Sequence, residues 1–148
     1  MKCFERIVRF HLLKQTNSYL AYQNNRSGDD ATLTLLHHVY THLEKPGAFA
    51  RLLFIDFSSA FYTIQPHLMA RKLLKFNVNP RLILWIVDFL VNRSQRVRYE
   101  STYSLSRTTS TGAPQGTVLS PILFTLYTND CQGNESTPLI KYSDDSAF

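Results

Sequence analysis

Residues 112–127 read GAPQGTVLSPILFTLY, a loop rich in glycine and proline that runs into an apolar helix pattern. Pro121 suits the first turn of a helix, where its missing N–H group is not needed. The apolar positions then recur at the spacing of a helix: Leu119, Ile122, Leu123, Leu126 and Tyr127. We therefore expect a tight loop that turns into a helix at Ser120 and Pro121.

Two short apolar stretches on either side of this segment end in aspartate. LLFID ends at Asp56, and LIKYSDD ends with Asp144 and Asp145. Their length and composition predict a buried strand that ends at Asp56 and, later, a strand, a tight turn and the start of a second strand. A carboxylate at the end of an apolar strand costs desolvation energy, and an adjacent pair adds repulsion. Either a magnesium ion relieves this cost, or the doublet is a solvated turn.

Helices are predicted for much of the remaining sequence. Residues 3–14 are amphipathic, and residues 16–28 have the composition of a loop. A helix is expected within residues 28–47, capped by Asp29 or Asp30 and ended by Pro46 and Gly47. The expected apolar stripes of these two helices are Phe4, Ile7, Val8 and Leu12, and Leu33, Leu36, Tyr40 and Leu43.

Two more helices are expected to begin at Pro66 and Pro80, and the second is apolar almost all round, which predicts burial. Residues 94–111 alternate polar with apolar or β-branched side chains, as a hairpin or two short strands would. The order of elements predicts an α+β fold with an antiparallel sheet and helices on one side.

Composition limits the class of protein. The chain has 148 residues, of which 44% are hydrophobic, enough for one domain with a core. Its net charge of +5 favours a polyanionic partner such as nucleic acid. The two cysteines make neither a disulfide framework nor a zinc site. Without a signal peptide or an apolar span, we expect an intracellular protein, cytoplasmic or nuclear, with no membrane association.

Three motifs carry a family resemblance: FIDFSSAF (residues 54–61), GAPQGTVLSPILF (residues 112–124) and YSDD (residues 142–145). In this order and at these separations they resemble the palm motifs of reverse transcriptases, with the closest similarity to non-LTR (LINE-type) retrotransposons. The linking segments resemble that family too, so the similarity covers nearly the whole chain. It implies a right-hand polymerase palm over residues 1–148. From the same resemblance we expect the fingers strands and the thumb to lie outside this sequence, and the palm to be truncated at both ends.

The resemblance implies roles for six residues. Asp56, Asp144 and Asp145 would hold two Mg²⁺ ions, with Mn²⁺ as an alternative. Phe61 would pack against the sugar of the incoming nucleotide, while Gln115 and Gly116 would lie beside that nucleotide. The implied partners are an RNA template, a DNA primer and deoxynucleoside triphosphates. The glycine and proline of the loop would let the backbone approach the nucleotide closely.

Simpler roles stay open for the same residues. Phe61 can be a core aromatic and Gln115 an ordinary loop amide. His38 and His42 lie one helical turn apart, but they lack a third zinc ligand, which favours a solvated helix face. Four arginines can follow a phosphate backbone or simply face water: Arg93, Arg96, Arg98 and Arg107.

One position departs from the family pattern, because Tyr62 stands where relatives usually carry Asp or Asn. RNA-templated DNA polymerisation is therefore expected as ancestry. Weak or absent activity is expected for this chain, since the template grip would be lost. The alternative is a non-catalytic nucleic-acid binder or an inert relic of a decayed retroelement.

Overall fold

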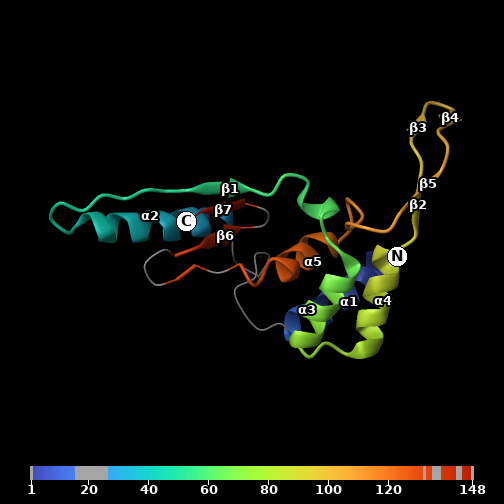
Figure 1. Cartoon of the computed structure of the whole chain (residues 1–148), viewed down its shortest axis with the longest axis horizontal. Helices are drawn as coiled ribbons and strands as arrows, with labels where there is room; N and C mark the ends of the chain where they lie inside the picture. Colours follow the sequence, from blue (N-terminus) through green and yellow to red (C-terminus); the bar gives the residue numbers. More distant parts are fainter. Residues whose placement is uncertain (1, 16–26, 132, 135–137, 143–144, 148) are drawn as a thin grey trace.

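The computed structural model describes residues 2–15, 27–131, 133–134, 138–142 and 145–147. These residues form a mixed α+β fold, confirming that class (Figure 1). The helices are α1 (Lys2–Gln15), α2 (Gly28–Leu43), the 3-10 helix η1 (Ala60–Tyr62), α3 (Pro66–Lys75), α4 (Pro80–Leu90) and α5 (Ser120–Tyr127). The strands are β1 (Phe54–Asp56), β2 (Arg93–Gln95), β3 (Arg98–Tyr99), β4 (Thr102–Tyr103), β5 (Arg107–Thr109), β6 (Ile140–Tyr142) and β7 (Asp145–Ala147).

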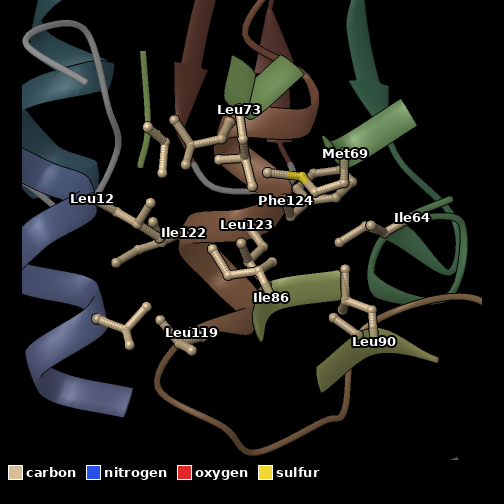
Figure 2. Packing of buried hydrophobic residues seen from close by; sticks show 14 of the residues in the cluster. Leu12, Ile64, Met69, Leu73, Ile86, Leu90, Leu119, Ile122, Leu123 and Phe124 are labelled. Carbon is tan, nitrogen blue, oxygen red and sulfur yellow. The ribbon is translucent and has the colours of Figure 1, made fainter. Parts of the chain in front are cut away.

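The hydrophobic core lies among α1, α3, α4 and α5, with α5 at its centre (Figure 2). Every residue of α5 from Ile122 to Leu126 is buried, and so is the preceding Leu119. Side chains from the other elements surround it: Leu12 from α1, Ile64 after η1, Met69 and Leu73 from α3, and Ile86 and Leu90 from α4. The apolar pattern of residues 119–127 therefore marks the central helix of the core.

A separate three-stranded antiparallel sheet has the order β1-β7-β6. Helix α2 packs along β6, and the sheet lies to one side of the helical core in Figure 1. The prediction that β1 is a buried strand is wrong, because Phe54 and Ile55 are 69% and 36% exposed. The core helices pack on one another rather than over this strand, so its apolar residues face solvent.

The stripe predicted for the first helix is half right. Val8 and Leu12 are buried in the core, whereas Phe4 and Ile7 are exposed. The third buried residue of α1 is Glu5, which lies on the same face as Val8 and Leu12. The core-facing side is therefore turned away from the predicted stripe by about one residue position.

The predicted cap of α2 is also corrected. The N-cap is Ser27, whose Oγ accepts from the N–H of Asp30 at 3.3 Å, while the Asp30 carboxylate accepts from the N–H of Ser27 at 2.7 Å. This reciprocal pair is a capping box, so Asp30 is the N3 residue rather than the cap. The predicted stripe of this helix is exposed at Leu33, Leu36, Tyr40 and Leu43. Of the loop predicted for residues 16–28, residues 16–26 lie outside the described residues.

The helices predicted at Pro66 and Pro80 begin at those residues. Burial in α4 is limited to one face, with Ile83, Ile86 and Leu90 buried and Leu84 exposed, so the expectation of an all-round buried helix is wrong. The predicted hairpin is confirmed: β2 pairs with β5 and β3 pairs with β4, forming an arm that projects from the core (Figure 1).

Candidate active site

Asp56 and Asp145 are register partners across the antiparallel strands β1 and β7. Directly opposite residues of such a pair lie on the same face of the sheet. The first and third sequence motifs therefore each bring one acidic residue to the same point of the fold. Asp56 is exposed. Asp144 lies outside the described residues.

The segment after Asp56 connects the sheet to the core helix. The backbone turns through Ser59, which has a φ of +59°, into η1. Phe57 and Phe61 both make edge-to-face contacts with Phe124 of α5, at ring-centroid distances of 5.6 and 5.8 Å. The first motif is thus held against the helix of the second motif by aromatic packing. Phe61 is half-buried, as expected for a core aromatic residue. Its role at a nucleotide stays a prediction.

The glycine that opens the second motif docks onto η1. The N–H of Ala113 donates to the carbonyl oxygen of Phe61 at 2.6 Å, and the N–H of Gly112 donates to that of Ile64 at 2.7 Å. A Cβ at Gly112 would lie 2.7 Å from Tyr62 Cα and 2.8 Å from Phe61 O, and its φ is +74°. Glycine is needed here because two backbone segments meet, whereas the sequence argument ascribed the need to a nucleotide.

The second glycine of the loop has different surroundings. Gly116 has a φ of +72°, but a Cβ there would meet nothing within 4 Å. Gln115 and Gly116 are both exposed. The part of the loop predicted to lie beside the incoming nucleotide is therefore open to solvent, and its predicted role is neither confirmed nor contradicted.

Arg93 holds the loop from the other side. Its guanidinium donates to the carbonyl oxygens of Leu90, Thr111 and Gly112 at 3.1, 2.6 and 2.9 Å. Burial lowers the pKa of this guanidinium from its ordinary value. Of the four arginines considered for phosphate contact, Arg93 is thus committed to the protein's own backbone.

Glu5 is a buried part of the site that the sequence argument missed. Its side chain is 3% exposed, and Oε2 accepts from the N–H of Val118 at 2.8 Å. Nearby, the hydroxyl of Ser120 donates to the carbonyl oxygen of Pro114 at 2.6 Å. Helix α1 therefore fixes the end of the Gly112–Ser120 loop. The signal that could have found Glu5 is its position three residues before Val8 and seven before Leu12.

Two lysines hold the carboxyl end of α5, and neither was predicted. Lys72 donates to the carbonyl oxygen of Tyr127 and forms an ion pair with Asp130 at 2.6 Å. Lys141 donates to the carbonyl oxygen and hydroxyl of Thr128 at 2.5 and 2.9 Å. Burial lowers the pKa of the Lys141 ammonium. Because Lys141 belongs to β6, it ties the sheet that carries Asp145 to the core helix.

Within the described residues, no three histidine, cysteine, aspartate or glutamate side chains gather as a metal site. His38 and His42 are exposed on α2, as expected for a solvated face. The predicted ligand set includes Asp144, which those residues do not contain. Its donors are carboxylate oxygens, and the register of Asp56 with Asp145 suits a hard divalent cation.

An α+β fold whose acidic residues meet across neighbouring antiparallel strands is the arrangement of a polymerase palm. The family model described as reverse transcriptase (RNA-dependent DNA polymerase) matches residues 1–148. The chain therefore belongs to the reverse transcriptase family, whose domains generally use divalent metal ions and bind a template, a primer and deoxynucleoside triphosphates. No curated protein matches the chain. Within the described residues, no helix is both long and apolar enough to cross a bilayer.

Proposed function

We propose that this chain is the palm of a non-LTR (LINE-type) reverse transcriptase and that residues 54–61, 112–124 and 142–145 form its catalytic site. The observation that carries the proposal is the register of Asp56 with Asp145 on adjacent strands. The LINE-type assignment is supported by the form of the motifs, above all GAPQGTVLSPILF at residues 112–124.

In the proposed site, Asp56, Asp144 and Asp145 hold two Mg²⁺ ions, which Mn²⁺ can replace because it prefers the same oxygen donors. When bound, two such metal ions would activate the primer 3′-oxygen and stabilise the pyrophosphate that leaves. The protein's own contribution is position. Phe61 is backed by Phe124 and would limit space at the sugar, and the open backbone at Gln115 and Gly116 would lie beside the nucleotide.

Primer extension tests this function. The full chain is incubated with a DNA primer on an RNA template, deoxynucleoside triphosphates and Mg²⁺ or Mn²⁺. We expect weak extension, because Asp56 is exposed and water screens the charges there. Asp145→Asn should abolish it, whereas Asp88→Asn, which alters an exposed aspartate of α4, should not. No extension by the unaltered chain, or equal extension by Asp145→Asn, would contradict the proposal.

A further inference from the structure

In the hairpin arm, residues 93–109, every residue from 94 to 108 is exposed. The arm projects from the helical core in Figure 1, and Tyr99 and Leu105 near its end are 74% and 91% exposed. Between the pairs Gln95 with Arg107 and Arg98 with Tyr103, the outgoing strand has two residues and the returning strand has three. This extra residue is a β-bulge, which increases the local twist of the arm.

The arm concentrates positive charge. It contains four arginines and one glutamate, a net charge of +3 in a chain whose total is +5. Arg93 is occupied at the base, whereas Arg96, Arg98 and Arg107 are exposed. The ion pair found among the described residues is Lys72 with Asp130, so these three arginines have no carboxylate partner there. Uncompensated charges of one sign on a projecting element attract a polyanion.

Aromatic rings are interleaved with these charges. The guanidinium carbons of Arg96 and Arg98 lie 4.4 and 5.9 Å from the centre of the Tyr103 ring, which holds both cations on one face of the arm. Tyr99 follows Arg98 in the strand and pairs with Thr102, so it belongs to the other face. The arm therefore offers two cations, Arg96 and Arg98, on one side and an exposed aromatic ring on the other.

We propose that this arm binds single-stranded nucleic acid, with Arg96, Arg98 and Arg107 contacting phosphates and Tyr99 stacking on an unpaired base. A single strand is favoured over a duplex because the bases of a duplex already stack on one another, and Tyr99 needs a free base face. The inference rests on the proposed function only in that the partner is nucleic acid. The arm is a different element from the β1–β7 pair that carries Asp56 and Asp145.

The test measures binding of the full chain to labelled oligo(U) and oligo(dT) of about 20 nucleotides by fluorescence anisotropy at several salt concentrations. The arm variant Arg96→Gln/Arg98→Gln/Arg107→Gln is compared with a charge-matched control, Arg71→Gln/Lys75→Gln/Arg81→Gln, which alters exposed residues of α3 and α4. The slope of log K against log salt is negative. We expect the arm variant to reduce its magnitude by about 2, since each phosphate contact on a single strand contributes about 0.7. The control should change it by less than about 1.

Stacking is tested separately from charge. Tyr99→Ala should weaken binding by about tenfold with the salt slope unchanged, whereas Tyr40→Ala, at an exposed tyrosine of α2, should have no effect. Circular dichroism melting of each variant checks that the fold is retained. Tighter binding of oligo(U) or of oligo(dT) supports the proposal in either case and identifies the strand.

Three results would overturn the proposal: equal loss of binding in the arm variant and its charge-matched control, tighter binding of duplex than of single strand, or wild-type binding by the arm variant. Failure of the proposed catalytic function gives a different result. A chain that binds oligo(U) through the arm but never extends a primer therefore contradicts only the catalytic proposal.

Discussion

Asp56 and Asp145 are register partners on the antiparallel strands β1 and β7, although they belong to the first and the third sequence motif. Two further relationships fix the elements around them. Phe57 and Phe61 pack on Phe124, and Lys141 of β6 holds the last turn of α5. Helix α5 therefore contacts the elements of the candidate site at two places, through the segment that follows β1 and through β6.

The contact between Gly112 and η1 predicts unequal effects of two glycine substitutions. Gly112→Ala places a Cβ against backbone atoms of Phe61 and Tyr62, which cannot move aside as a flexible side chain can. We expect it to lower the free energy of unfolding by about 3 kcal/mol or more. Gly116→Ala meets open space and should cost about 1 kcal/mol for its positive φ. Urea unfolding measures both, and equal costs would refute the docking role of Gly112.

Glu5 predicts a stability effect far from its own helix in sequence. Glu5→Ala removes the acceptor of the Val118 N–H, and an unpaired buried donor costs about 2 kcal/mol. Glu5→Gln keeps an oxygen acceptor and should cost less. The control is Glu44→Ala at an exposed residue, expected to change stability by less than about 0.5 kcal/mol. A Glu5→Ala chain as stable as the control would show that the contact does not hold the loop.

The ion pair of Lys72 with Asp130 predicts a small pH dependence. The hydrogen bond from Lys72 lowers the pKa of the Asp130 carboxyl. Its folded-state pKa is thus below the unfolded value of about 4, so the stabilisation is present above that value and is lost as the pH falls through the folded pKa. Because the Asp130 side chain is 74% exposed, the contribution is below about 0.5 kcal/mol.

Thermal unfolding at neutral and acidic pH measures this effect. Asp130→Asn should lose stability slightly at neutral pH and match the unaltered chain once the carboxyl is protonated. Lys72→Met should cost more, about 1 kcal/mol, because the carbonyl oxygen of Tyr127 also loses its donor. If both variants have the same cost at every pH, the second contact of Lys72 contributes nothing.

Local patterns predicted the elements whose cause is local. Pro66 and Pro80 begin helices because a proline at the first turn loses no hydrogen bond, and residues 119–127 form a buried helix because their apolar side chains cover its surface. The strand ending at Asp56 and the paired strands β6 and β7 were found in the same way. Their register was not predicted, since it depends on which backbone groups meet in space.

The missed features depend on distant partners. Three side chains bind backbone groups in the loop before α5 or at the end of this helix: Glu5, Lys72 and Lys141. The residues next to them in the sequence do not indicate these partners. The apolar stripe of α2 is the opposite case, because it was predicted to be covered and is exposed. An amphipathic pattern identifies the apolar face of a helix without showing that the fold covers it. The cap was misassigned because Ser27 and Asp30 act together.

The central claim, that Asp56 shares a divalent metal site with its register partner, can be tested without turnover. Fe²⁺ replaces Mg²⁺ in the full chain, and ascorbate with hydrogen peroxide then cuts the backbone beside the bound ion. We predict cuts around residues 56 and 145 in the unaltered chain and in Asp88→Asn, suppressed by excess Mg²⁺ and absent from Asp56→Asn. The same cuts in Asp56→Asn, or no localised cut in the unaltered chain, would contradict the claim.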